Sequence, residues 1–203
     1  MNALIREYSE KKELIQGRLM DFRSLNEGEW FDEMLFCLLT PQSNAKKCWE
    51  AVIELKNKGV NRLSEKEVAR ILKTKTRFHN NKAKYVKLAV LQWGDVKKKL
   101  DGVDNDVVDV RNWIAESVCG MGYKEAGHFL RNIGKSDNKI AILDRHILRN
   151  LKELGVIKSE ELKGKDSYFE VERKFIDFSD KIGIPIDELD LLFWSRENGE
   201  VFK

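Results

Sequence analysis

Proline and cysteine are scarce in this sequence, and this scarcity already restricts the fold and the cofactors. Two prolines in 203 residues, together with abundant Lys, Glu and Leu and little alternation of apolar and polar residues, predict an all-α fold. The three cysteines, Cys37, Cys48 and Cys119, are too few for a four-cysteine iron–sulfur site, and no Cys-x-x-Cys spacing suggests zinc. They lie in apolar stretches with helical periodicity and are expected to be reduced core thiols.

The sequence also lacks a strong excess of charge of one sign and a long hydrophobic run. Charged residues make up 35% of the chain, yet the formal net charge is only +3, which indicates a mixed surface on which local basic patches can still bind nucleic acid. No apolar run is long enough to span a membrane and no signal peptide is recognisable, so we expect an intracellular, cytoplasmic protein without a membrane partner. A chain of this length can bury one core or two small lobes.

Helix signals follow one another along the chain. Residues 30–39 are apolar all round, which indicates a buried core helix, and the polar loop after it contains Ser43 and Asn44, either of which can cap the next helix. Ser159 is predicted to open one helix and Ser167, with Glu170, another, whereas residues 94–106 are predicted to be a polar connection. Further helices are predicted over 2–22, 45–57, 64–72, 145–154 and 168–182, together with one that ends at Trp93 and one that begins at Pro185.

A helix-hairpin-helix is predicted at about residues 107–133. Apolar residues recur at helical spacing on both sides of a short turn that contains Gly120 and Gly122. These glycines allow a tight turn without side-chain bulk, and the second helix is expected to open near Tyr123. Backbone N–H groups exposed at such an opening attract a phosphate group.

Lys124 is unusual because it falls in the first turn of the second predicted helix. The positive end of the helix dipole disfavours a cation there, which suits a nucleophilic amine. A lysine that contacts phosphate or is simply solvated is the plainer interpretation. Asp144 and His146 follow twenty residues later, where an aspartate that opens a helix is most often an N-cap.

Taken together, these two segments resemble the helix-hairpin-helix DNA glycosylases related to endonuclease III. The pattern of that superfamily is a hydrophobic-x-Gly-x-Gly-x-Lys-x-Ala hairpin followed by Asp-x-His about twenty residues later. Gly120, Gly122, Lys124, Ala126, Asp144 and His146 fall in place. Cys119 replaces the usual proline, and Leu143 stands where many relatives have valine. An Arg-Phe…Lys-Ala segment at 77–83, Trp194 and the lysine at 203 are similar to the archaeal-type 8-oxoguanine DNA glycosylases.

The resemblance implies a fold and a set of site residues. It implies two helical lobes, one formed by the N-terminal and C-terminal helices and the other by the middle helices, with the active site in the cleft between them. Lys124 would be the catalytic nucleophile and Asp144 the catalytic carboxylate. The implied DNA-binding and base-binding residues are Gln42 or Asn44 in the space left by the flipped base, Phe78 as a stacking or wedging group, the Gly120 and Gly122 backbone, Trp194 and Lys203. The carbonyls of Glu116, Val118 and Met121 would hold a monovalent cation, and no other metal, iron–sulfur cluster or organic cofactor is implied.

The implied activity is removal of 8-oxoguanine from double-stranded DNA by base flipping, followed by strand cleavage through a lysine Schiff base, by a monomer. An endonuclease III-type glycosylase/lyase for oxidised pyrimidines shares Lys124 and Asp144 but usually carries an iron–sulfur loop. An adenine mismatch glycosylase would lack the catalytic lysine. A non-catalytic helix-hairpin-helix module would need the glycines but not the combination of Lys124 and Asp144.

Overall fold

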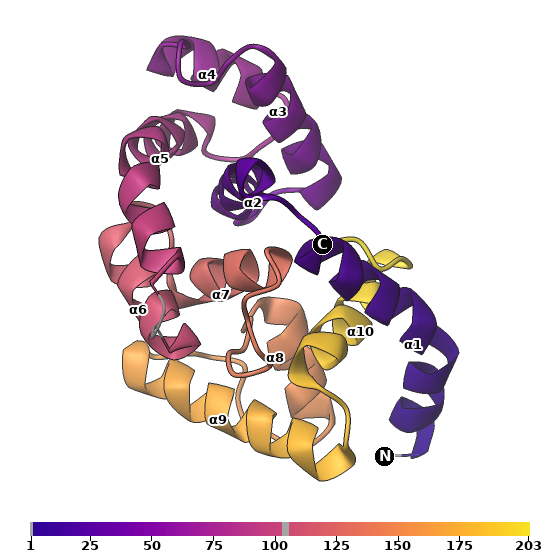
Figure 1. Ribbon diagram of the computed structural model, residues 1–203. Helices are drawn as coiled ribbons and strands as arrows, with labels where there is room; N and C mark the ends of the chain where they lie inside the picture. The colour runs from indigo at the N-terminus through magenta and orange to yellow at the C-terminus, as the bar shows by residue number, and fades with distance from the viewer. Residues whose placement is uncertain (1, 103–105) are drawn as a thin grey trace. The chain divides into compact units, whose positions relative to one another are not determined.

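The computed structural model describes residues 2–102 and 106–203, apart from the side chains of 197 and 198 (Figure 1). Within these residues the chain forms ten α-helices and no strand, which confirms the predicted all-α class. In this described part, no helix is both long enough and apolar enough to cross a membrane. The chain divides into two compact units, one made of residues 1–24 and 130–203 and the other of residues 25–129.

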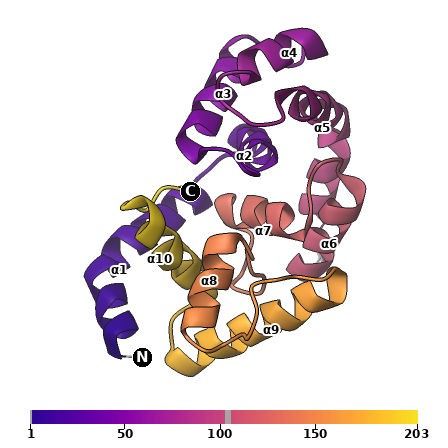
Figure 2. The ribbon, with the colours of Figure 1, turned by 180° about the vertical axis from the view of Figure 1, so that it is seen from behind.

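The unit of residues 25–129 is built around helix α2 (Glu27–Leu39). Helices α3 (Ala45–Asn57) and α5 (His79–Leu100) pack on α2, and α4 (Glu65–Leu72) contacts both α3 and α5 (Figures 1 and 2). Helix α2 is buried on nearly all sides from Trp30 to Leu39, as its apolar sequence predicts. Asn26 and Glu29 form a capping box that begins the helix, so its entry point is fixed locally.

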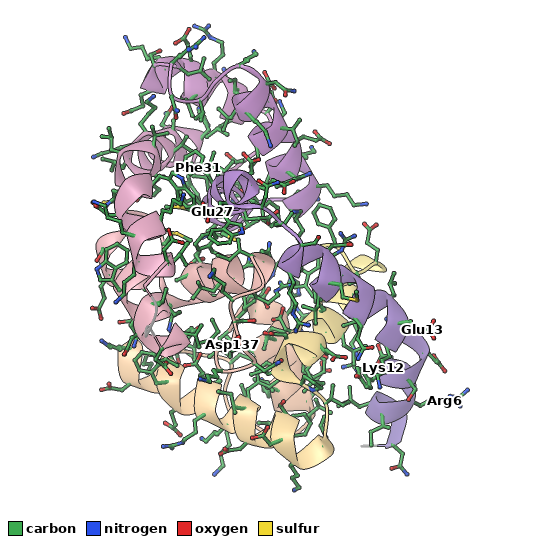
Figure 3. All side chains as sticks on the ribbon, viewed as in Figure 1. Arg6, Lys12, Glu13, Glu27, Phe31 and Asp137 are labelled. Atoms are coloured by element: carbon green, nitrogen blue, oxygen red, sulfur yellow. The ribbon has the colours of Figure 1, made fainter. Side chains whose placement is uncertain are left out.

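Two contacts seal α2 against α5. The rings of Phe31 and Trp93 lie 5.2 Å apart at a tilted angle, and the carboxylate of Glu27 lies 2.5 Å from the ammonium group of Lys97 (Phe31 and Glu27 are labelled in Figure 3). Such an aromatic pair contributes about 0.5–1.5 kcal/mol beyond the area that it buries. The exposed ion pair contributes less because water screens it.

Helix α5 is longer than the sequence predicts. It does not end at Trp93 but continues through Gly94 to Leu100, so the predicted polar connection over 94–106 is wrong in its first part. Burial of Val96 and Leu100 repays the conformational cost of helical Gly94, and Lys97, Lys98 and Lys99 suit the negative end of the helix dipole. Of the remaining stretch, residues 103–105 lie outside the described part of the chain.

The same unit contains α6 (Val107–Ser117) and most of α7 (Tyr123–Asn132). These two helices lie where the helix-hairpin-helix is predicted, and α7 begins at the predicted Tyr123. Asp106 caps α6 by accepting a hydrogen bond from Val108 N at 2.7 Å. The hairpin is therefore a local feature whose two ends are both specified by nearby residues.

The unit of residues 1–24 and 130–203 contains α1 (Asn2–Arg23), α8 (Arg145–Glu153), α9 (Lys165–Ile182) and α10 (Ile186–Asn198). Helix α10 packs on α1, α8 and α9, and its Leu189, Leu192 and Phe193 are fully buried. The Tyr8 hydroxyl of α1 donates to Glu188 at 2.5 Å, and Arg196 binds both Glu7 and Asn150. These bonds join the first and last helices into one unit.

Two capping predictions in this unit are wrong. Ser159 opens no helix, because its hydroxyl accepts a hydrogen bond from Glu161 N in a turn. Ser167 is not an N-cap either, since α9 already begins at Lys165 after Gly164, and the Ser167 hydroxyl donates back to the Gly164 carbonyl. Pro185 lies one position before the first helical residue of α10, as its N-cap.

Candidate functional site

The turn of the hairpin is shaped by a close approach of backbone to an aromatic ring. Gly120 has a left-handed φ of +89°, and a Cβ atom added there would lie 2.6 Å from the ring of Tyr85. Both conditions require glycine. The backbone of the hairpin turn therefore lies directly against the Tyr85 ring of α5.

We expect Gly120→Ala to destabilise the protein by about 1–3 kcal/mol, because alanine adds backbone strain and displaces the Tyr85 ring. Gly94→Ala is the matched control, since Gly94 lies within a helix and has no atom within 4 Å of a Cβ position. That control should stabilise the protein by about 0.5–1 kcal/mol. Urea unfolding of both variants measures the difference, and equal effects would contradict the assigned role of Gly120.

Lys124 lies in the first turn of α7, as predicted, and it has an acidic neighbour. Its ammonium nitrogen is 2.7 Å from Glu125 Oε1, and its side chain is 24% exposed, so it is accessible but held. The second Glu125 oxygen accepts a hydrogen bond from Gly122 N at 3.1 Å. Glu125 therefore joins the candidate nucleophile to the helix opening, and the Gly122 amide that was expected to face a phosphate is bonded to this carboxylate.

The start of α7 is also held from α6. Arg111 is fully buried, and its guanidinium lies 5.6 Å from the centre of the Tyr123 ring. The Tyr123 hydroxyl donates to Glu116 Oε1 at 3.1 Å. A cation over an aromatic face adds rigidity when it is desolvated. The residue that precedes Lys124 is thus fixed in place by two residues of α6.

Asp144 is the N-cap of α8 in the other unit. Its Oδ1 accepts hydrogen bonds from His146 N at 2.8 Å and from Ile147 N at 2.9 Å. Asp144 itself is half-buried, and three apolar residues before it, Ala141, Ile142 and Leu143, are buried. The cap therefore fixes the carboxylate on a rigid element and leaves it partly accessible.

The loop between α2 and α3 presents Gln42 at its tip. Gln42 has a left-handed φ of +55° and an exposed side chain. Asn44 caps α3 through a hydrogen bond from Lys47 N to its Oδ1 at 3.1 Å. Ser43, the other cap suggested by the sequence, instead accepts a hydrogen bond from Arg77 N at 2.9 Å. Of the two candidates for the space left by the flipped base, Asn44 is therefore occupied as the N-cap of α3, whereas Gln42 caps no helix.

Phe78 projects from a second loop of the same unit. It is 54% exposed, has a left-handed φ of +55°, and immediately precedes α5 as its N-cap. The Arg77 guanidinium lies 5.4 Å from the centre of its ring. A large aromatic ring held at a strained backbone position in water indicates a binding role, because burial does not explain it.

The two remaining predicted residues lie in the unit of residues 1–24 and 130–203. Trp194 is half-buried on α10, and the Lys203 ammonium lies 5.9 Å from the centre of the Phe22 ring. Cys37 and Cys48 are buried, as expected of core thiols. Cys119 is exposed in the hairpin turn, so its assignment to the core is wrong: the turn residue next to Gly120 faces outward. In the described part of the chain, no three His, Cys, Asp or Glu side chains are grouped to hold a metal ion.

Three polar residues of the site were not predicted from the sequence. The sequence suggests Ser43 only as a cap, and Lys82 only as part of the Arg-Phe…Lys-Ala segment at 77–83. Glu125 has a local signal, because a glutamate three residues after a helix N-cap is a recognisable capping residue. Lys82 gives no comparable local signal, because its partners lie about 40 residues earlier in the chain.

These features together define a class: helix-hairpin-helix proteins with a lysine at the start of the second helix and an aspartate-capped helix after it. A family model described as 8-oxoguanine DNA glycosylase matches residues 15–184. An 8-oxoguanine DNA glycosylase/AP lyase from Fusobacterium nucleatum is 38% identical over 100% of this chain and 97% of its own.

Solved structures agree with the family model. The crystal structure of an 8-oxoguanine DNA glycosylase from Methanocaldococcus jannaschii matches with a TM-score of 0.88 and 32% identity, over 100% of this chain and 97% of that one. The glycosylase/lyase of the same organism, in complex with a 15mer DNA that contains 8-oxoguanine, matches with a TM-score of 0.86 and 31% identity over the full length of both chains. This chain belongs to the 8-oxoguanine DNA glycosylase family.

Proposed function

We infer that this chain removes 8-oxoguanine from double-stranded DNA and then cleaves the strand at the resulting abasic site. Membership of the family over residues 15–184, with a lysine in the first turn of the second hairpin helix, carries this inference. The lysine matters because base removal alone needs only water. A bifunctional enzyme needs an amine that forms a covalent bond to the sugar.

Lys124 is the proposed nucleophile. Its neutral amine attacks C1′ of the deoxyribose, a C–N bond forms, and the bond from C1′ to the damaged base breaks. The sugar ring opens to a Schiff base, loss of a proton from C2′ follows, and the C3′–O bond to the 3′ phosphate breaks by β-elimination. An amine attacks only in its neutral form, so attack requires Lys124 to lose a proton and leave its ion pair with Glu125.

Asp144 is the proposed electrostatic partner of this reaction. Its carboxylate stabilises the positive charge that develops on the sugar as the base leaves, and it can accept a proton from the attacking amine. The helix cap supports this role because it holds the carboxylate in one orientation before substrate arrives. No rearrangement of Asp144 is then needed during the reaction.

The exposed loops of residues 25–129 are proposed to act on the duplex. We assign the space left by the flipped base to Gln42, because Asn44 is already committed to capping α3. Phe78 is the proposed wedge, since its ring is exposed and held at a strained position. The backbone around Gly120 and Gly122 is proposed to face phosphates, which for the Gly122 amide requires that its bond to Glu125 Oε2 break on binding. Trp194 and Lys203 are proposed to contact the flipped base.

The hairpin carbonyls of Glu116, Val118 and Met121 are proposed to hold a monovalent cation. The first of them lies in the last turn of α6, where backbone carbonyls carry partial negative charge, so the donor chemistry fits a cation. We propose no other cofactor. We propose a monomer, because one chain suffices for one lesion. Since the proposed substrate is chromosomal DNA, we also propose that the protein acts at the nucleoid.

The proposal is tested by base excision under single-turnover conditions. The wild-type protein should release 8-oxoguanine opposite cytosine and nick the same strand, and it should leave an undamaged duplex intact. A thymine glycol duplex separates the alternatives. Excision of thymine glycol without 8-oxoguanine would assign the chain to oxidised pyrimidines, and tight DNA binding without any excision would assign it to non-catalytic modules.

A further inference from the structure

The two exposed loops described above are tied together by one buried cation and one hydroxyl group. Lys82 lies in the first turn of α5 and is only 4% exposed. Its ammonium donates to the carbonyl of Leu39 at 2.7 Å, to the carbonyl of Pro41 at 2.8 Å and to the hydroxyl of Ser43 at 2.8 Å. An ammonium group has three protons, so all three donors are used within the loop that carries Gln42.

Ser43 extends this arrangement to the second loop. Its hydroxyl accepts from Lys82 at 2.8 Å and from Arg77 N at 2.9 Å, and it donates to the Pro41 carbonyl at 3.4 Å. Arg77 directly precedes Phe78. Ser43 is thus linked to both exposed tips: it follows Gln42 in the chain, and its hydroxyl is bonded to the residue before Phe78.

Both tips need such support because both are strained. Gln42 and Phe78 each have a φ of +55°, a region that a side chain larger than glycine occupies at a cost of about 1–3 kcal/mol unless its surroundings enforce it. Neither tip is held by burial, because both side chains are exposed. The bond from Lys82 to the Leu39 carbonyl is buried and those to Pro41 and Ser43 are part-buried, so water competes little with them. The bond from Arg77 N to Ser43, which lies at the surface, extends this hold to the second loop.

The electrostatics of Lys82 suit a holding role. Burial lowers the pKa of Lys82 to about 8, with the neighbouring charges of Lys124 and Arg77 acting in the same direction. At neutral pH the ammonium is still the main form and keeps its three donors. The thiol of Cys48, whose pKa burial raises to about 11, stays neutral and donates to the same Leu39 carbonyl at 3.2 Å.

We propose that Lys82, acting through Ser43, is a positioning residue for base flipping: it presets the Gln42 and Phe78 tips as one rigid unit. The proposal rests on the proposed function, since it gives these tips their place on DNA. If both tips are already ordered in the free protein, binding to the duplex loses no conformational entropy in these loops. Lys82 contacts no reacting atom in this proposal and acts on Lys124 only through its charge, so its loss should slow base removal far more than the lyase chemistry.

The test compares Lys82→Met with Lys87→Met. Lys87 lies on the same helix and also donates three hydrogen bonds, to the carbonyls of Val60, Asn61 and Leu63, but in the connection between α3 and α4. Lys82→Met should slow 8-oxoguanine excision about 100-fold, the effect of a misplacement near 1 Å. Cleavage of single-stranded DNA at a preformed abasic site, where no base must leave the stack, should stay near the wild-type rate. Lys87→Met should leave both rates unchanged.

Hydrogen exchange gives a readout that is independent of activity. Lys82→Met should accelerate amide exchange in both loops, around residues 40–44 and 76–78, whereas Lys87→Met should accelerate it only around residues 58–64. If Lys82→Met does not fold, Ser43→Ala carries the test, because it removes the shared hydroxyl and should slow excision but not abasic-site cleavage.

Three results would overturn the proposal. Unchanged excision in Lys82→Met is one, and exchange that accelerates in only one loop is another. An equal loss of excision and abasic-site cleavage is the third, because it would assign Lys82 to the chemistry at Lys124. Failure of the proposed function is distinguishable from all three, since then the wild-type protein itself would not excise 8-oxoguanine.

Discussion

Lys124→Gln should abolish strand cleavage at 8-oxoguanine, with a fall in rate of at least about 10³-fold, because glutamine cannot form a Schiff base with the sugar. Binding to the same duplex should change little. Glutamine is one atom shorter than lysine, but it is uncharged and polar and its amide N–H can donate to Glu125, which now holds the lysine at 2.7 Å. Single-turnover cleavage on a denaturing gel, with duplex affinity measured in parallel, checks both statements.

The control for this variant is another lysine of the same unit that also forms an ion pair with a glutamate. Lys75 lies 2.7 Å from Glu54 with a side chain that is 20% exposed, so Lys75→Gln removes a similar ion pair away from the hairpin. That control should cleave at close to the wild-type rate. Residual strand cleavage by Lys124→Gln above the rate of spontaneous abasic-site breakage would assign the nucleophile to another amine.

Asp144→Asn should lower base excision by about 10²–10³-fold while leaving the fold intact. The reason is that Asp144 has two separable roles. As an N-cap it needs only an oxygen acceptor for His146 N and Ile147 N, and asparagine supplies one as well as aspartate does. As an electrostatic partner of the positively charged sugar it needs the negative charge, which asparagine lacks.

Asp144→Ala separates the two roles further. It removes both the charge and the cap, so it should lose excision as Asp144→Asn does and also lose about 1 kcal/mol of stability. Urea unfolding and single-turnover excision of both variants test this. Full activity in Asp144→Asn would show that the cap is the only role of the aspartate.

The helices whose starts are set by nearby residues could be predicted from the sequence. Ser64 and Glu67 form a capping box at the start of α4, within the helix predicted over 64–72, and Tyr123 opens α7 where the glycines of the hairpin indicate. Caps act over three or four residues, so the local sequence indicates them, although Ser159 and Ser167 carry a similar signal and cap no helix. The end of α5 is wrong because tertiary burial decides it. Gly94 looks like a helix end, but the burial of Val96 and Leu100 carries α5 past it.

The site residues divide in the same way. One short motif, which can be recognised in the sequence, contains Gly120, Gly122 and Lys124. Two polar loops contain Gln42 and Phe78. What the sequence does not reveal is what holds these loops. The bonds of Lys82 to Leu39 and Ser43 join residues 43 and 39 positions apart in the chain, and no pattern in the sequence predicts contacts over such separations. Only the packing of α5 on α2 brings them together.

Borohydride trapping followed by peptide mapping tests the central claim most directly. The wild-type protein is mixed with a duplex that carries one 8-oxoguanine opposite cytosine, reduced with borohydride, digested, and searched for the peptide bonded to deoxyribose. The predicted result is one adduct, on Lys124, that is absent with an undamaged duplex. An adduct on a different amine would contradict the assignment of Lys124. The absence of any adduct, with 8-oxoguanine nonetheless released, would contradict the Schiff-base mechanism itself.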